Sequence, residues 1–547
     1  MLTIVGADRA QADGGRVLVV VAAQPGETRA AERLVERLGG DVEQRLPIVH
    51  GFAARVPAGA IARLRRSAAV RSVARDAALT LSSAEPVDDE SAAATIDPPP
   101  AEIPTGEPAD QIARDAIADA AGDIAGDTTL APEPVTGGDD TVGALQDAVS
   151  DPVAPIEPAA DDGPSRARAS MDLVRAAAGA QGELTGAGVD VALIDSGVLG
   201  VSALDGPGKL VRGPDFSEDA YDPDLRGLDA FGHGSHMAGV IAGNDADTGY
   251  QGIAPGARLV SVKVAGADGI TSLVRVLMAL DWVRRNRDSG GLHIRVLNLS
   301  FGVDARRSYV REPLAYAAEQ LWSRGITVVA AAGNRADGTG SLDLPAADPF
   351  LLAVGATDTQ HTADPADDTV AEFSSRDAVR PPDVVAPGTG VISLRVPGST
   401  LDEEFPAARI GEGFFRGSGT SQATAVVSGV VARLLEARPE LTPDQAKALL
   451  KSGAVDLPAD VSTDGAGRVD LARSLALPTP AAAPQPYQPA VMDLGILWGD
   501  LLAEALGTAP TIGTGENGWT GRRWSGRSWS GRRWSGRSWS SDEWGGQ

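Results

Sequence analysis

Over the first 81 residues of the chain, the apolar residues follow two periodicities, one typical of strands and the other of helices. The pattern predicts strand, helix, strand, strand, helix and strand, marked by Val17–Ala23, Ala31–Leu38, two short apolar runs around His50 and Phe52, Ile61–Leu64 and Val70–Val73. Residues 1–81 are therefore expected to form a small α/β sandwich of β-α-β-β-α-β type.

A second and longer region of mixed pattern runs from about residue 165 to residue 477. Apolar runs that suit buried strands alternate there with helical segments; the runs lie at Val189–Ile194, Arg258–Val264, Val296–Leu299 and Ile326–Ala332. This alternation predicts an α/β domain built on a parallel sheet that is covered by helices.

The stretch between these regions, residues 82–164, shows little helical or strand periodicity and is strongly acidic. From Ser83 to Gly163 it holds 20 Asp or Glu residues against the single Arg114, a local charge of -19. The whole chain has 48 basic and 74 acidic residues, a charge of -26, so most of the excess lies in this stretch. The composition predicts a disordered acidic linker, and the overall acidity argues against nucleic-acid binding.

Three absences narrow the classes of function. The chain has no cysteine, which excludes disulfides, a thiolate nucleophile and Cys-ligated metals. It has no apolar run of 18 residues, so no membrane span is expected. The opening residues also lack a basic segment followed by an apolar core, so no signal peptide is visible.

The C-terminal part changes composition twice. Residues 478–516 form a Pro-rich connection with a short apolar segment at Leu494–Leu506, either a docking helix or a disordered stretch. Residues 517–547 repeat tryptophan every five residues, at Trp519, Trp524, Trp529, Trp534, Trp539 and Trp544. A period of five gives no single apolar stripe, which favours a flexible tail. The alternative is a binding tail whose Trp and Arg side chains stack on sugars, polyanions or cell-envelope polymers.

Four segments of the second region place polar side chains where strands end or helices begin. VALIDSGV puts Asp195 at the end of a strand, GHGSHMAG puts His233 at a helix start, VVAAAGN puts Asn334 after a strand, and GSGTSQATA puts Ser421 before a buried helix. A serine needs a base to become a nucleophile, histidine is that base near neutral pH, and an aspartate orients the imidazole. Asn334 and the backbone N–H of Ser421 are candidate donors for an oxyanion.

Each segment alone also has a structural explanation, as a turn cap, a tight turn or a helix cap. Their joint occurrence in the chain order Asp, His, Ser, with the Asn between, is more specific, because this is one of the known orders of a catalytic triad.

From Met171 to Leu475 the chain resembles the subtilisin-like serine proteases, also in the segments GIAPGARLVSVKV, VLNLSFG, VVAPG and GRVDLARSL. The resemblance implies a serine endopeptidase, a hydrolase whose triad is Asp195, His233 and Ser421, with Asn334 as oxyanion donor. It implies a structural role for the second histidine, His236. It also implies that the substrate-binding residues Ser300, Phe301, Gly302, Ala330, Ala331, Ala332 and Gly333 line the primary specificity pocket, and that Gly269, Ile270 and Thr271 flank an extended substrate that adds as a strand.

The N-terminal 81 residues resemble the inhibitory propeptide of the same family, a ferredoxin-like α/β domain, most clearly at His50 to Val73. Such a domain assists folding and then blocks the cleft, which implies a zymogen. An unrelated α/β module is the alternative. Arg168, within PSRARAS at the end of the linker, is a candidate site of self-processing.

One candidate residue concerns specificity. Counted back from Leu344-Pro345, Asp343 falls at the floor of the primary pocket by resemblance, and an acid there favours a basic side chain. Arg335, next to Asn334, lies by resemblance near the mouth of the pocket. Pairing of the two side chains would neutralise the charge and leave the family's usual preference for large apolar residues.

Metal binding is left open by the sequence. NDADTG offers Asn244, Asp245 and Asp247 as weak calcium candidates where subtilases often carry a calcium loop, and a solvated acidic turn is an equal alternative. Carboxylates also gather between Asp215 and Asp229, as expected by chance in an acidic chain. No cofactor is expected for catalysis.

The sequence thus predicts a secreted or surface-associated serine endopeptidase, made as a zymogen, that cuts proteins or peptides and carries its own propeptide in the cleft. The alternative is a non-hydrolytic binding scaffold with a subtilase-like fold, anchored by its Trp/Arg tail.

Overall fold

The computed structural model describes residues 16–76, 78–81, 162–304, 309–335, 341–483, 485–487 and 489–490. The predicted acidic linker up to residue 161, the apolar segment at Leu494–Leu506 and the Trp/Arg tail lie outside these residues. No described helix is long and apolar enough to cross a bilayer.

The N-terminal domain has the predicted order of elements: β1 (Arg16–Ala23), α2 (Thr28–Arg37), β2 (Asp41–Leu46), β3 (Gly51–Pro57), α3 (Ile61–Arg65) and β4 (Val70–Arg75). Its antiparallel sheet has the order β2-β3-β1-β4. Because side chains alternate along a strand, β1 contributes to two cores. Val19 and Val21 join the domain's own core, whereas Val20 and Ala22 join the core of the second domain.

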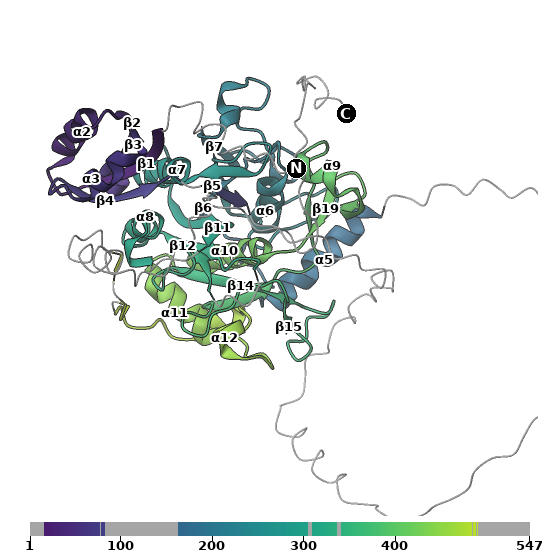
Figure 1. Cartoon of the computed structure of the whole chain (residues 1–547). Coiled ribbons are helices and arrows are strands. Elements are labelled where there is room, and N and C mark those ends of the chain that lie inside the picture. Colours follow the sequence, from purple (N-terminus) through teal and green to yellow (C-terminus); the bar gives the residue numbers. More distant parts are fainter. Residues whose placement is uncertain are drawn as a thin grey trace, which may run out of the picture. The chain divides into compact units, whose positions relative to one another are not determined.

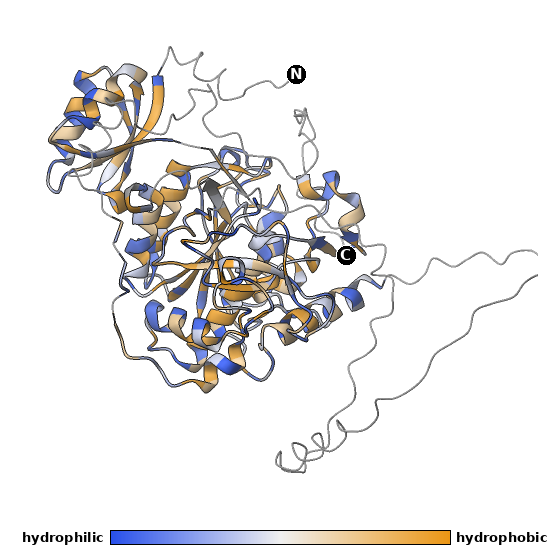
Figure 2. Ribbon diagram, turned by 60° about the horizontal axis from the view of Figure 1, so that its bottom comes forward, coloured by the Kyte–Doolittle hydropathy of each residue, from blue (hydrophilic) through white to orange (hydrophobic). Residues whose placement is uncertain are grey.

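The second domain is built on an eight-stranded sheet that is mostly parallel, as the sequence predicted (Figure 1). Its strands are β6 (Asp190–Asp195), β7 (Leu210–Asp215), β8 (Arg258–Lys263), β10 (Ile294–Leu299), β12 (Thr327–Ala331), β14 (Leu352–Asp358), β15 (Thr369–Val370) and β16 (Val384–Pro387). The order is β15-β14-β12-β10-β6-β8-β7, with β16 also paired to β14, and only the edge strand β15 is antiparallel. The central strands are mostly apolar (Figure 2), as expected when helices cover a parallel sheet.

The helices of this domain are α5 (Gly163–Ala177), α6 (His233–Ala242), α7 (Leu273–Asn286), α8 (Pro313–Trp322), α9 (Thr400–Glu404), α10 (Thr420–Ala437), α11 (Pro443–Gly453), α12 (Val461–Asp464) and α13 (Leu471–Ala476). Short 3-10 turns lie at Pro47–Val49, Ala58–Ala60, Ser202–Leu204, Glu218–Tyr221, Tyr309–Arg311 and Pro406–Ala408. Helix α10 packs on β10, β12 and β14 and beside α6, and its first sixteen residues are all buried. The predicted apolar helix after Ser421 is therefore a central element of the core.

Two small sheets complete the fold. One has the order β13-β11-β5-β9 and consists of β5 (Ala78–Leu81), β9 (Ile270–Ser272), β11 (Phe301–Asp304) and β13 (Asp343–Leu344). The other has the order β17-β19-β18, from β17 (Val391–Leu394), β18 (Arg409–Ile410) and β19 (Phe414–Gly417). Strand β5 follows the N-terminal domain in the chain, yet it pairs with β9 and β11 of the second domain.

A buried group of charges ties α11 to the sheet. The Asp383 carboxylate, in a residue 1% exposed, contacts Lys447 Nζ and Lys451 Nζ at 3.1 Å each and accepts from Arg380 at 2.9 Å. Burial alone would raise the pKa of Asp383, but Lys447, Arg380 and Lys451 hold it below its ordinary value. Burial lowers the pKa of Lys447 to about 8.

Removal of this carboxylate is expected to destabilise the domain strongly. Asp383→Ala leaves Lys447 buried without its counter-ion, a loss of about 3–5 kcal/mol in the free energy of unfolding. Chemical denaturation in a Ser421→Ala background, which removes the predicted nucleophile, measures it. Glu412→Ala is the control, because its side chain is 98% exposed and should change stability by less than about 0.5 kcal/mol. Equal effects of both substitutions would contradict the assigned role of Asp383.

Candidate active site

Asp195 and His233 are brought together from the end of a strand and the start of a helix. Asp195 is the last residue of β6 and His233 the first of α6, and each side chain is 1% exposed. The His233 Nδ1 atom lies 2.9 Å from Asp195 Oδ1 and 3.0 Å from Oδ2. A buried carboxylate in this position holds the proton of the imidazole on Nδ1 and leaves Nε2 as the basic nitrogen.

Ser421 lies in the first turn of α10, where the helix dipole favours negative charge. Its Oγ donates a hydrogen bond of 3.1 Å to the carbonyl oxygen of Ser300. The first turns of α10 and α6 both lie next to Gly417. A Cβ atom on Gly417 would be 2.6 Å from Nε2 of Gln422 in α10 and 3.2 Å from Nε2 of His236 in α6. The structure thus brings the three predicted triad residues to one region.

Asn334 follows β12 and is fixed by the same helix start. Its Oδ1 accepts from the backbone N–H and the hydroxyl of Thr420, both at 2.9 Å. Its buried Nδ2 has no hydrogen-bond acceptor among the residues described. The amide is therefore held by its oxygen while its N–H donors are left for another group.

His236 lies one turn after His233 and has the surroundings of a structural residue. Its Nε2 lies 3.1 Å from the Phe415 carbonyl oxygen. Burial and, secondly, the nearby His233 lower the pKa of His236 to about 4. The ring is therefore neutral at physiological pH and contributes packing and one hydrogen bond.

Two of the segments expected to bind substrate lie on either side of β5: Gly269 to Thr271, expected to flank an extended substrate, and Ser300 to Gly302, expected to line the primary pocket. On one side Gly269 precedes Ile270 and Thr271 of β9; on the other Ser300 precedes Phe301 and Gly302 of β11. Strand β5 runs antiparallel to both, with Leu79 opposite Thr271 and Thr80 opposite Gly302. A peptide of the chain itself thus lies where strand addition was predicted.

The residues expected to line the primary pocket also gather here. Ala330 and Ala331 end β12, Ala332 and Gly333 follow them, and Asp343 opens β13. A Cβ atom on Gly302 would lie 2.5 Å from the Asp343 Cβ, and one on Gly333 would meet the Asp343 carboxylate. The Asp343 side chain therefore packs between two glycines, and it forms an ion pair with Arg335, the arrangement that would neutralise its charge.

Comparison with known proteins identifies the family of the chain. Residues 186–471, just over half of the 547-residue chain, match the profile of the Subtilase family of peptidases. The chain belongs to the subtilase family.

Individual relatives of this subtilase are proteases by name. It is 38% identical over 279 residues to serine protease AprX of Bacillus subtilis (strain 168), an alignment covering 49% of this chain and 62% of AprX. It is 34% identical over 289 residues to M-protease of Shouchella clausii (strain KSM-K16), of which it covers 64%, and to subtilisin Savinase of Lederbergia lenta, of which it covers 91%. In both cases the alignment takes 52% of this chain. The chain thus spans under two thirds of AprX and of M-protease.

A solved structure shows the same fold. Fervidolysin of Fervidobacterium pennivorans, described as a keratinolytic enzyme related to subtilisin, superposes with a TM-score of 0.57 at 21% identity. The superposition covers 85% of this subtilase and 62% of fervidolysin.

In the candidate calcium loop of this subtilase, the Asp245 carboxylate accepts hydrogen bonds from other residues of the chain. Asp245 Oδ1 accepts from the backbone N–H of Asp247 at 3.0 Å, and Oδ2 accepts from Ser202 Oγ at 3.0 Å. Within the described ranges no group of three or more His, Cys, Asp or Glu side chains could hold a metal. Calcium binding at Asn244, Asp245 and Asp247 remains a prediction.

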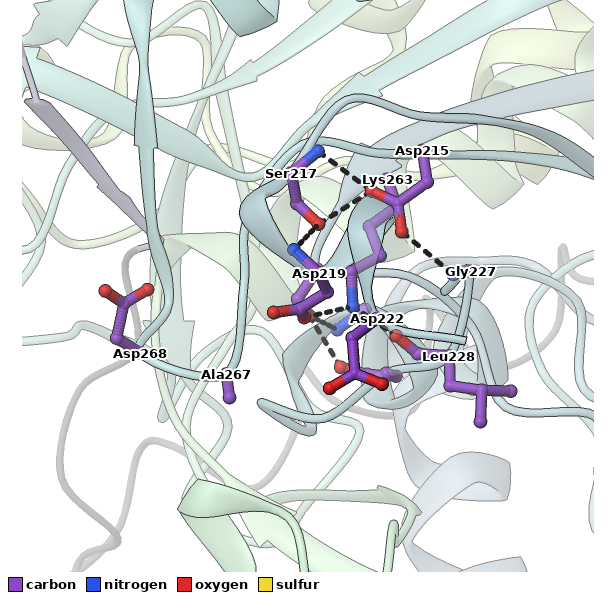
Figure 3. Close-up of polar contacts among 12 residues, drawn as sticks. Asp215, Ser217, Asp219, Asp222, Gly227, Leu228, Lys263, Ala267 and Asp268 are labelled. Atoms are coloured by element: carbon purple, nitrogen blue, oxygen red, sulfur yellow. Dashed lines mark hydrogen bonds and ion pairs between the residues drawn. The ribbon is translucent and has the colours of Figure 1, made fainter. Parts of the chain in front are cut away.

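Of the carboxylates between Asp215 and Asp229, that of Asp219 pairs with a buried lysine (Figure 3). Lys263 of β8 is 2% exposed, pairs with Asp219 at 2.7 Å and donates to the Leu228 carbonyl. Asp215 instead accepts from the hydroxyl and N–H of Ser217 and from the Gly227 N–H. A side-chain ammonium therefore supplies the positive charge here.

Sequence reasoning missed two residues of this site, Ser196 and Asp229. Ser196 directly follows Asp195 and is fully buried, and Asp229 lies four residues before His233 and is 2% exposed. Their hydroxyl and carboxylate are 2.7 Å apart. Their adjacency to triad residues in the sequence is the signal that could have identified them.

Proposed function

We propose that this subtilase is a serine endopeptidase that hydrolyses peptide bonds of proteins or peptides. The observation that carries the proposal is the buried contact of His233 Nδ1 with both Asp195 oxygens, beside the helix start that carries Ser421. His233 removes the Ser421 proton during attack on the carbonyl and returns it to the leaving amine.

The oxyanion formed in that step needs donors. Asn334 Nδ2 supports this role, since it is buried and has no acceptor among the described residues. The N-terminal end of α10 adds the favourable end of its dipole.

We also propose that the chain is made as a zymogen whose N-terminal domain inhibits it. Strand β5 supports this by pairing with both β9 and β11. Asp76 accepts a hydrogen bond of 3.0 Å from the Val274 N–H at the start of α7. The pairing and this helix cap bind the N-terminal domain to the second domain, and β5 must leave before another peptide can bind.

An extracellular or cell-surface location belongs to the same proposal and follows from the resemblance to subtilases. Binding of a cell-envelope polymer by the Trp/Arg tail remains a prediction, as the tail lies outside the described residues.

The first test concerns the triad and the oxyanion donor. Ser421→Ala should abolish turnover about as fully as the triple replacement of Asp195, His233 and Ser421, because the three residues act as a unit. Asn334→Ala should lower kcat roughly 10²–10³-fold, a magnitude known from a subtilisin. Turnover of a peptide substrate and labelling by an organophosphonate probe measure both effects. Absence of turnover and of Ser421 labelling in the processed wild type would favour the non-hydrolytic scaffold.

The second test concerns self-processing. Along β5, Thr80 lies opposite Gly302 and Leu81 lies opposite Phe301. Phe301 directly follows Ser300, whose carbonyl oxygen accepts the hydrogen bond from Ser421. Arg168, in contrast, lies inside α5, where backbone N–H groups are engaged in helical hydrogen bonds.

We therefore expect self-cleavage within a few residues after Leu81 rather than at Arg168. Mass spectrometry of both fragments locates the cut, with Ser421→Ala as the uncleaved control. A first cut at Arg168 in the wild type, absent from Ser421→Ala, would contradict the inhibitory placement of β5 while leaving the protease function intact.

The third test concerns the Arg335–Asp343 pair at the primary pocket. Arg335 neutralises the carboxylate that a basic substrate side chain would otherwise contact, so the pair should weaken selection for basic residues. Arg335→Ala should then raise the ratio of kcat/KM for Arg over Phe before the scissile bond by about 10–100-fold, and Asp343→Ser should lower it. Matched peptides give the ratios. If both variants keep the wild-type ratio, the Arg335–Asp343 pair has no role in specificity and the pocket is an ordinary apolar one.

A further inference from the structure

Helix α6, which begins with the catalytic base, lacks a capping side chain of its own. The residue before His233 is Gly232, with φ of 102°, a left-handed conformation that favours glycine. A Cβ atom at this position would also lie 2.5 Å from Ser399 Oγ. The N–H groups of the first turn must therefore find acceptors elsewhere.

Two buried residues supply these acceptors. The Asp229 carboxylate accepts from the Gly232 N–H and the Ser235 N–H, at 2.7 Å each. Ser196 Oγ accepts from the Gly234 N–H at 2.9 Å. The start of α6 is thus held by one residue of its own loop and by one residue that follows β6.

The Ser196 hydroxyl has a single proton and two carboxylates within reach. Asp229 Oδ1 lies at 2.7 Å and Asp195 Oδ1 at 3.2 Å, so the proton is directed to Asp229. Asp195 Oδ1 keeps as donors the Ser196 N–H at 2.7 Å and His233 Nδ1 at 2.9 Å.

We infer that Ser196 and Asp229 form a positioning bridge for the proposed catalysis. The bridge fixes the end of β6, which carries Asp195, against the first turn of α6, which carries His233. It also draws the Ser196 hydroxyl proton away from Asp195, so that the Asp195 carboxylate interacts more strongly with the imidazolium. Ser196 and Asp229 act through Asp195 and His233 and touch no substrate. The inference rests on the proposed protease function.

The bridge also adds a negative charge near the base. Among the described residues, three charged or titratable groups contact His233 or the first turn of α6: Asp195 on β6, Asp229 on the loop before α6, and His236 on the same helix. Lys263 on β8 lies opposite Asp195 in the sheet, and its ammonium is paired with Asp219. Loss of the Asp229 charge disfavours the imidazolium, so a lower pH is needed to protonate His233. The acid limb of the kcat/KM profile should then move to lower pH.

The experiment compares Asp229→Asn and Ser196→Ala in the full, self-processed chain, with kcat normalised to active sites titrated by the organophosphonate probe. Asp229→Asn should lower kcat by about 10–100-fold with KM nearly unchanged. It should also move the acid limb downward by roughly 0.5–1 pH unit. Ser196→Ala keeps the charge, so kcat should fall roughly 10-fold while the acid limb stays in place. Ser196→Thr restores the hydroxyl and should recover kcat to within about twofold.

Two matched controls lie in the loop between β7 and α6. Asp222→Asn removes an equal charge from a carboxylate that accepts only from the Asp224 N–H among the described residues. Ser217→Ala removes a buried hydroxyl that also bridges an aspartate and a backbone N–H. Both should leave kcat and its pH profile unchanged.

Lower thermal stability with wild-type kcat in Ser196→Ala, or no recovery in Ser196→Thr, would overturn the bridge as a positioning device. A wild type without turnover or Ser421 labelling would instead overturn the proposed function. If Asp229→Asn fails to fold, the Ser196 variants and their rescue still decide between the outcomes.

Discussion

The site depends on one buried contact, the hydrogen bonds between the Asp195 carboxylate and His233 Nδ1 in side chains that are each 1% exposed. A carboxylate removed from water is costly unless donors surround it, and Asp195 also accepts from the Ser196 N–H. The partners must moreover arrive from separate parts of the chain, the end of β6 and the start of α6. The parallel sheet satisfies this requirement, because polar residues at the carboxyl ends of its strands meet the amino ends of the helices that cover it.

The same principle places the other components. Ser421 lies in the first turn of α10, and Asn334, which follows β12, is fixed by two hydrogen bonds from Thr420. Helix α10 is buried over most of its length, so its position against the sheet is rigidly determined. The residues of the proposed active site thus lie on loops and at helix ends, while the accuracy of their placement comes from the core.

The N-terminal domain shows how one strand serves two packing interfaces. Val19 and Val21 of β1 fill its own core, and Val20 and Ala22 on the opposite face pack into the core of the second domain. The face of β1 that carries Val20 and Ala22 is therefore buried only when the N-terminal domain packs against the second domain. This packing is consistent with the pairing of β5 with β9 and β11, because both contacts hold the domain at the strands that are proposed to bind substrate.

The sequence by itself determined the βαββαβ order, the parallel sheet and the chain positions of Asp195, His233, Asn334 and Ser421, because periodicity and strand or helix ends are local properties of the chain. The resemblance to subtilases implied that Asp343 and Arg335 both lie at the primary pocket, and the structure pairs the two side chains. Only the tertiary structure showed Lys263 among the carboxylates, Ser196 joined to Asp229, and Arg168 within a helix rather than at the end of a linker. Ser196 and Asp229 are 33 residues apart, and the direction of a single hydroxyl proton depends on a difference between 2.7 and 3.2 Å. No pattern along the chain encodes such a distance, since it is set by how a strand and a helix pack together.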